Sequence, residues 1–96
     1  MTAYVIYEGQ VHDPALYEIY KAEAQETIRA AGGRYIARGG KTVPLEGEGP
    51  AERTVVVEFP DLASALAWYH GEAYSAARAR RQGAATARMW VVEGLD

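Results

Sequence analysis

The order in which strand-like and helix-like segments follow one another most constrains the fold of this chain. Four short segments are rich in β-branched and aromatic residues, which favour strands: residues 3–9, 34–40, 53–59 and 87–94. Longer stretches with apolar residues at helical spacing follow the first and the third. The resulting order, β-α-β-β-α-β, is that of the ferredoxin-like fold. We therefore predict an α+β protein with a four-stranded antiparallel sheet and both right-handed crossover helices on one face.

Signals at both ends bound the first helix. Asp13 can accept hydrogen bonds from free backbone N–H groups, and Pro14 suits the first helical position. Gly32 and Gly33 end the helix, because glycine readily adopts the left-handed conformation. Residues at spacings of three and four predict one buried face: Tyr17, Tyr20, Ala24, Thr27, Ile28 and Ala31.

The second crossover begins after Asp61, a second N-cap residue. Residues 62–70 form its helix, and after Gly71 a further helical stretch covers residues 72–83. One predicted stripe contains Leu62, Leu66 and Tyr69, with Ala65 and Trp68 beside it. Between the middle strands, residues 41–52 read as a surface loop, although residues 42–45 could extend the second strand.

The strands carry apolar residues on both faces, although two helices can cover only one. In the last strand Met89 and Val91 alternate with Trp90 and Val92, so neither face is polar. A second copy of the chain is the simplest cover for the remaining face. We predict a homodimer packed through its sheets.

The second strand, RYIARGG, raises the question of what Arg38 meets. Strict alternation places two sets of side chains on opposite faces: Arg34, Ile36 and Arg38 on one, Tyr35 and Ala37 on the other. Arg38 could grip a ligand carboxylate or enolate, with Gly39 and Gly40 allowing a bulge or a close backbone approach. Alternatively, Arg38 forms an ion pair with Glu52, Glu58 or another strand carboxylate.

Composition narrows the classes of function. The chain has 96 residues, which predicts a single domain over residues 1–96, and its net charge of −3 argues against nucleic acid as a partner. It has no cysteine and two solitary histidines, His12 and His70, so we expect no metal site. No dinucleotide-binding or P-loop motif occurs, and we expect no cofactor. Without a signal-peptide pattern or a long apolar run, we expect no membrane association and a cytoplasmic location.

Several stretches together resemble the DUF1330 family: AYVI, the DP…Y..Y helix start, GGRYIARGG, ERTVVVEFP and RQGAATARMWVVEG. The resemblance covers nearly the whole chain in order. It implies membership of the dimeric α+β barrel superfamily, and the family's own activity is undefined. Proteins that share only this fold include antibiotic-biosynthesis-type monooxygenases, haem-degrading enzymes and muconolactone-isomerase-type enzymes.

The resemblance also implies a pocket between the sheet and its helices. It nominates nine residues: Asp13, Tyr17, Tyr20, Arg38, Gly39, Trp68, Tyr69, Tyr74 and Arg81. Tyrosine can donate to a developing oxyanion, and aromatic rings can stack on a planar ligand. Each residue also has a structural alternative. Asp13 is explained as an N-cap, the aromatic residues as core or dimer contacts, and Arg81 as a helix-end or intersubunit ion pair.

These observations lead to one functional hypothesis and its alternatives. The chain is predicted to bind a small anionic or phenolic metabolite, with Arg38 as the anion anchor and aromatic walls. A catalytic version would be a cofactor-independent oxygenase or isomerase in which Tyr20 or Asp13 handles protons. The main alternative is a non-catalytic ligand-binding or accessory protein with a purely structural dimer. Haem degradation is a third hypothesis. Added haem would test it through a shift of the Soret band, and we expect no such shift.

Overall fold

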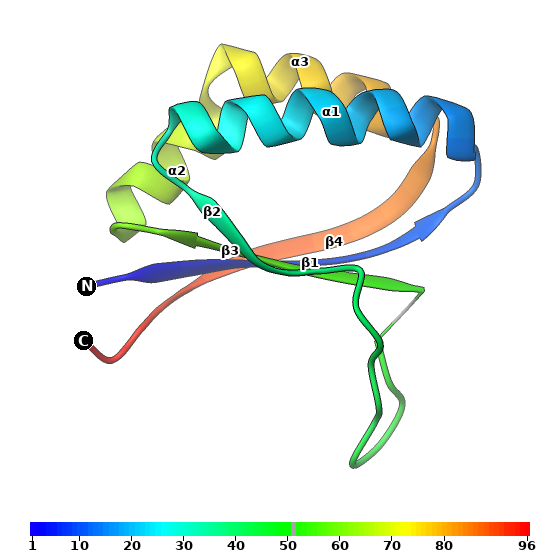
Figure 1. Cartoon of the computed structure of the whole chain (residues 1–96), viewed down its shortest axis with the longest axis horizontal. Helices are drawn as coiled ribbons and strands as arrows, with labels where there is room; N and C mark the ends of the chain where they lie inside the picture. The colour runs from blue at the N-terminus through cyan, green and yellow to red at the C-terminus, as the bar shows by residue number, and fades with distance from the viewer. Residues whose placement is uncertain (51) are drawn as a thin grey trace.

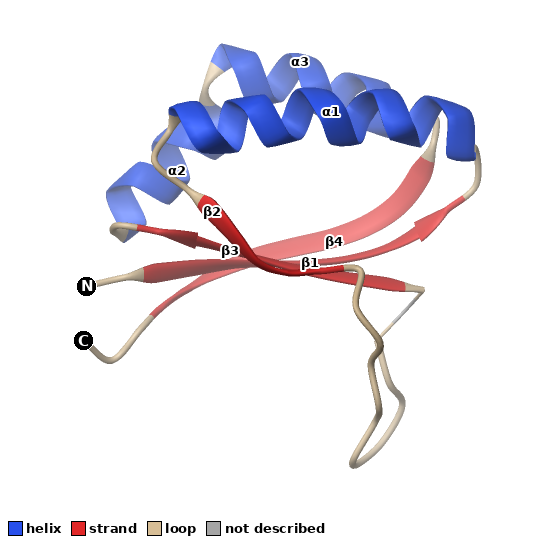
Figure 2. Ribbon diagram, viewed as in Figure 1, coloured by secondary structure: helices blue, strands red, loops and turns tan. Residues whose placement is uncertain are grey.

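A computed structural model describes residues 1–50 and 52–96. Its elements follow the predicted order, and the second crossover contains both predicted helical stretches: β1 (Ala3–Val11), α1 (Pro14–Ala30), β2 (Arg34–Arg38), β3 (Arg53–Phe59), α2 (Leu62–His70), α3 (Glu72–Arg81) and β4 (Ala85–Glu93). The four strands form one antiparallel sheet in the order β2-β3-β1-β4. The helices lie together on one face of this sheet (Figures 1 and 2). The predicted α+β fold is confirmed.

The first helix agrees closely with its sequence signals. The Asp13 carboxylate accepts a hydrogen bond from the Leu16 N–H at 3.2 Å, which confirms the N-cap. The buried residues of α1 are those of the predicted stripe: Tyr17, Tyr20, Ala24 and Ile28. At the other end Gly32 has a φ of +86°, and the Gly33 N–H donates to the Ile28 carbonyl at 2.9 Å. The left-handed Gly32 therefore ends the helix as expected.

The buried side of α2 differs from the predicted stripe. Ala65 and Trp68 are buried, whereas Leu66 is 42% exposed. The indole of Trp68 packs on Phe59, with ring centroids 5.3 Å apart, so the bulky indole and the small Ala65 face the sheet. The short helix ends at Gly71, and α3 then continues in a new direction (Figure 1). Spacing alone could not choose between two adjacent apolar stripes on so short a helix.

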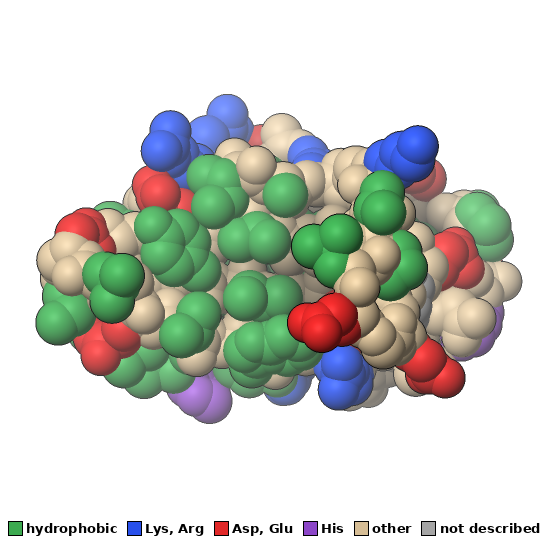
Figure 3. All heavy atoms as spheres, turned by 90° about the horizontal axis from the view of Figure 1, so that it is seen from below, with side chains coloured by type: hydrophobic (Ala, Val, Ile, Leu, Met, Phe, Trp, Pro, Cys, Tyr) green, Lys and Arg blue, Asp and Glu red, His purple; other side chains and the backbone are tan. Residues whose placement is uncertain are grey.

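The sheet has a closed inner face and an apolar outer face. Val5, Tyr7, Val55, Val57 and Phe59 are buried under the helices. On the outer face and along β2, three large apolar side chains are exposed: Ile36 at 47%, Trp90 at 43% and Val92 at 48%. Seen from this side, hydrophobic side chains gather over much of the surface (Figure 3). The predicted apolar character of both faces is therefore confirmed.

A β-bulge in β2 corrects the predicted alternation of that strand. Tyr35 lies opposite Val57 and Arg38 lies opposite Val55, but only Ala37 occupies the position between them, and Ile36 has no partner. The extra residue reverses the side-chain direction after it. Arg34 therefore stays on the outer face, while Arg38 joins Tyr35 on the inner, helix-facing side. The prediction that Arg34 and Arg38 share a face was wrong.

The connection between β2 and β3 projects away from the helices (Figure 1). Residues 42–45 form no strand, and Leu45 is 92% exposed. The predicted loop over residues 41–52 is thus confirmed except at residue 51, which lies outside the described residues. The last strand begins at Ala85, two residues earlier than predicted.

Candidate functional site

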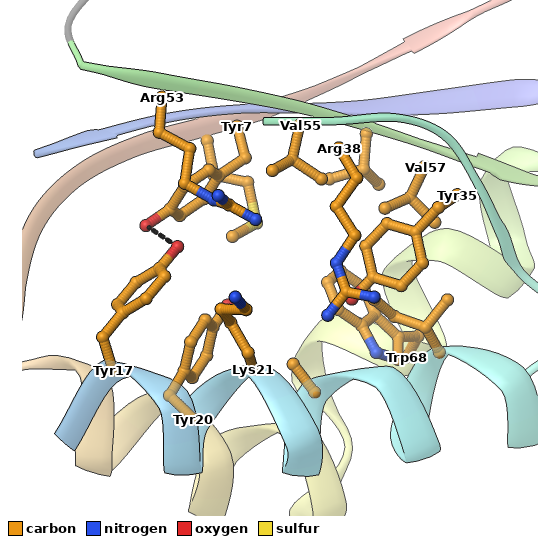
Figure 4. Close-up of a pocket in the computed structure, with 14 residues that line it drawn as sticks. Tyr7, Tyr17, Tyr20, Lys21, Tyr35, Arg38, Arg53, Val55, Val57 and Trp68 are labelled. Atoms are coloured by element: carbon orange, nitrogen blue, oxygen red, sulfur yellow. Dashed lines mark hydrogen bonds between the residues drawn. The ribbon is translucent and has the colours of Figure 1, made fainter. Parts of the chain in front are cut away.

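A small cavity lies between α1 and the inner face of the sheet, beneath β2 and β3 (Figure 4). We call it the central cavity. Most of its wall is apolar, and its polar side chains include Tyr7, Tyr17, Tyr20, Lys21, Tyr35, Arg38 and Arg53. Its volume of about 30 Å³ suffices for about one or two water molecules. A larger ligand would therefore have to displace some of these side chains.

Arg38 points into this cavity because of the bulge. Its Nη1 donates to the Gln25 side-chain oxygen at 2.8 Å, and its guanidinium lies 4.3 Å from the centre of the Tyr35 ring. Within residues 1–50 and 52–96, no carboxylate reaches Arg38 at salt-bridge distance. Glu58, one of its expected partners, pairs instead with Arg34 at 2.9 Å on the outer face. The guanidinium of Arg38 is thus held only by a neutral amide and an aromatic ring.

Arg53 is a second cation that the sequence reasoning missed. Its Nε is buried without a hydrogen-bond partner, and its guanidinium lies 5.8 Å from the centre of the Tyr17 ring. Gly39 lies directly beside it: with a φ of +69°, a Cβ at Gly39 would stand 2.5 Å from Arg53 Nη1. The positive φ therefore favours glycine at 39, and a side chain there would also push aside the guanidinium of Arg53. Among the described residues, Arg53 too forms no salt bridge.

Two phenol pairs form one end of the site. The Tyr17 hydroxyl donates to the Tyr7 hydroxyl at 3.0 Å, and the hydroxyls of Tyr20 and Tyr74 are 2.8 Å apart. Burial is the main cause that raises the pKa of Tyr7, Tyr20 and Tyr74 above the usual range, with hydrogen bonding to Tyr17 and Tyr74 adding to the effect at Tyr7 and Tyr20. All three phenols therefore stay neutral at pH 7, where they can donate hydrogen bonds to an anion.

Arg81 lies behind these phenols. Its guanidinium stands 5.6 Å from the ring centres of both Tyr7 and Tyr20, and its Nη1 is buried without a hydrogen-bond partner. It does not line the central cavity. Among the described residues, Arg81 forms no salt bridge within the chain. The intersubunit ion pair stays a prediction.

The three aromatic residues after β3 mainly build the core. Trp68 borders the central cavity, and its indole N–H donates to Thr27 Oγ1 at 3.0 Å. Tyr74 is 1% exposed, and its ring lies 4.2 Å from that of Trp68. Tyr69 accepts a hydrogen bond from Arg78 at 2.5 Å and faces a different cavity of about 230 Å³ between α2 and β4. Only Trp68 of the three borders the site.

Asp13 lies apart from this site. It is exposed, it caps α1, and it borders none of the cavities described here. His12 lies nearby, with its Nε2 at 2.9 Å from Thr86 Oγ1. In the described part of the chain, no three His, Asp or Glu side chains are grouped so as to hold a metal ion. No helix there has the length and apolar character needed to cross a membrane.

Two of the missed residues had a signal in the sequence. Tyr7 lies two residues after Val5, and Arg53 lies two residues before Val55. Because residues two apart in a strand share a face, both side chains are expected on the buried face. The sequence reasoning assigned the two residues to strands and gave neither a place in the site. Lys21 carried no such signal, because its position on α1 is at the edge of the buried stripe.

Comparison with known proteins assigns this chain to a family. The model of the family described as Domain of unknown function (DUF1330) matches residues 2–95. The chain belongs to the DUF1330 family. No curated protein matches it in sequence.

Solved structures similar to this DUF1330 chain share its fold. A protein of unknown function from Rhodopseudomonas palustris is 16% identical, with a TM-score of 0.78 over 99% of this chain and 83% of that one. SnoaB, a cofactor-independent oxygenase from Streptomyces nogalater, is 12% identical, with a TM-score of 0.67 over 99% and 94%. A dimeric protein of unknown function and ferredoxin-like fold from Bacteroides fragilis is 17% identical, with a TM-score of 0.60 over 97% and 96%. At these identities the likeness shows the fold alone.

Proposed function

We propose that this DUF1330 protein binds a small, partly apolar anion between α1 and the sheet, with Arg38 as an anchor. One observation carries the proposal. Arg38 reaches the central cavity with no carboxylate partner among the described residues, and the cavity wall consists of apolar groups, tyrosine phenols and two further cations, Lys21 and Arg53. A guanidinium forms its strongest hydrogen bonds with carboxylates, phenolates and enolates. An anion would therefore gain more from Arg38 than the neutral Gln25 amide does.

The wall chemistry favours holding an anion over removing a proton. Among the described residues no carboxylate borders the central cavity, and the raised pKa of Tyr20 makes this phenol a hydrogen-bond donor and a poor base. Tyr20 and the Tyr7–Tyr17 pair can donate to a ligand oxygen if their mutual hydrogen bonds rearrange. The ligand itself should then be acidic enough to ionise when bound near Arg38.

Cofactor-independent oxygenation is the second candidate function, and the likeness in fold to SnoaB favours it. An electron-rich enolate or phenolate can react directly with O2. In the simplest balance a CH2 group next to the anionic system becomes a carbonyl, and O2 provides one oxygen atom to the product and one to water. Arg38 would stabilise the substrate anion, and Tyr20 would donate a hydrogen bond to its oxygen. Isomerisation of the same anion would instead return the proton to another carbon.

Thermal unfolding in the presence of small acids tests the binding proposal. A ligand that binds only the folded state raises the melting temperature. We expect aromatic carboxylates and phenolic acids to do so for the native chain and for Arg80→Ala, which removes an exposed arginine paired with Glu23 outside the site. Arg38→Ala should abolish the shift. An equal shift in Arg38→Ala would refute the anchor role, and oxygen uptake with the bound acid would distinguish oxygenation from binding alone.

We also infer that the outer face of the sheet is covered by a second copy of the chain. Its exposed apolar residues, including Trp90 and Val92, support this inference, as does the dimeric protein of similar fold from Bacteroides fragilis. Light scattering should give twice the chain mass at micromolar concentration. Val92→Glu should lower it to that of one chain, whereas Ile19→Glu, at a similarly exposed position on α1, should not. A native monomer would contradict the inference.

A further inference from the structure

The central cavity lies in line with two larger cavities along α1. One is near the start of the helix, with a volume of about 300 Å³, and Arg53 borders both it and the central cavity. The other lies nearer the end of the helix, also with about 300 Å³, and Arg38 borders both that one and the central cavity. Each arginine thus stands at one boundary of the closed apolar centre. Moving the two side chains aside would join the three cavities into one groove.

The strand register sets the distance between the two arginines. Arg38 lies directly opposite Val55, and Arg53 precedes Val55 by two residues, so all three side chains share the inner face. Diagonal neighbours of this kind have Cα atoms about 7–8 Å apart. Figure 4 shows both guanidinium groups descending from the sheet toward α1, with Val55 between them. Two positive groups therefore flank an apolar surface.

Three other cations border these cavities, Lys21, Arg29 and Arg34, and all three form salt bridges. Lys21 Nζ forms a salt bridge with Glu18 at 3.0 Å, so its charge already has a partner. Arg38 and Arg53 have none among the described residues, and the Nε of Arg53 is buried without any hydrogen bond. Arg38 is exposed and Arg53 is half-buried, so an incoming anion would give the buried Nε of Arg53 a partner and both cations a counter-charge. The site thus offers two separate places for negative charge, although Glu18 and Glu52 also border the cavity beside Arg53.

We propose that the ligand of this groove is a small diacid, with one carboxylate on Arg38, the other on Arg53 and a flat apolar body over Val55. This inference rests on the proposed function, since it assigns the class of the anion. Each guanidinium turns toward a flanking cavity to receive a carboxylate, and the apolar body enters the space that the guanidinium groups vacate. A monoacid would leave one of the two arginines without a partner.

Gly39 keeps Arg53 in position for this role. Its missing side chain leaves the space that Arg53 Nη1 occupies, so Gly39→Ala would displace the guanidinium without removing its charge. A fall of the diacid affinity in Gly39→Ala to that of Arg53→Ala would show that the placement of Arg53 matters as well as its charge.

Isothermal titration with benzoate and the three benzenedicarboxylate isomers tests the proposal. These probes share one flat ring and differ in the number and separation of their carboxylates. We expect isophthalate or terephthalate to bind roughly ten- to a hundredfold more tightly than benzoate, because one further charged hydrogen-bonded pair forms. Arg53→Ala should reduce the affinity for the diacid to about that for benzoate, so that the variant no longer distinguishes the two acids. Arg80→Ala should change neither affinity, since this residue borders none of these cavities.

The outcomes separate this inference from the proposed function. Equal affinities for benzoate and all the diacids, or full diacid affinity in Arg53→Ala, would overturn the two-anchor site and leave Arg38 as a single anchor. The absence of binding of any acid to the native chain would overturn both proposals. If Arg53→Ala does not fold, Arg53→Gln removes the same charge with less loss of side-chain volume, and the same comparison applies.

Discussion

The Tyr20–Tyr74 hydroxyl pair permits a prediction whose size follows from the structure. The two oxygens are 2.8 Å apart, and the side chains are only 7% and 1% exposed. Tyr20→Phe removes one hydroxyl and leaves the other buried without its partner. We expect a loss of about 1–3 kcal/mol in the free energy of unfolding, which is the usual cost of orphaning a buried polar group. For a domain of this size, each 1 kcal/mol lowers the melting temperature by about 4–8 °C.

The double variant makes this prediction sharper. Tyr74→Phe should cost about as much as Tyr20→Phe, but Tyr20→Phe with Tyr74→Phe should cost clearly less than the sum, because no hydroxyl is then left unpaired. Urea unfolding followed by circular dichroism measures the four free energies. Tyr4→Phe, a change on the half-buried outer side of the sheet, provides the control and should change stability little. Strictly additive losses would refute the hydrogen-bonded pair as the source of the effect.

Three further predictions concern the fold and the site. Asp61→Ala should lower the free energy of unfolding by about 1 kcal/mol in urea unfolding, because the Asp61 carboxylate accepts the Ser64 N–H at 2.7 Å at the start of α2; an unchanged midpoint would show that this cap adds nothing. Deletion of Ile36 should remove the bulge but keep Arg38 opposite Val55 on the inner face, and so retain the thermal shift given by acids; a lost shift would contradict our account of the strand. Stability should also fall as the pH rises above about 10, because the unfolded chain then releases phenolic protons that the folded chain retains. Burial causes this retention in Tyr7, Tyr20, Tyr35 and Tyr74, and the full tyrosinate absorbance of all seven tyrosines appearing before unfolding would contradict it.

Most of the fold could be predicted because its signals are local. Asp13 and Pro14 mark the start of α1, Gly32 marks its end, and the buried stripe between them follows the helical period. No signal within α2 itself determines which of its stripes is buried. It depends on Trp68 packing against Phe59 from the preceding strand, and no spacing within the helix contains that information.

The candidate site could be predicted only in part. The glycines and arginine of RYIARGG indicated the correct strand and residue, but strict alternation predicted the wrong face for Arg38. The partner of Arg38 was also missed, because Gln25 comes from α1 and meets Arg38 only after the helix packs on the sheet. Arg53 has an ordinary position in the sequence, and its relation to Gly39 arises only where the ends of β2 and β3 meet.

The sequence by itself determined the order of elements, the helix ends and the presence of apolar residues on both faces of the sheet. These properties depend on the conformational preferences of single residues and on the periods of short segments. The tertiary structure decided which side chains meet. One unpaired residue, Ile36, turns Arg38 inward, and the strand register then places Arg53 diagonally from it across Val55. The two-cation groove exists because strand pairing, a property of two distant segments together, fixes the direction and spacing of both side chains.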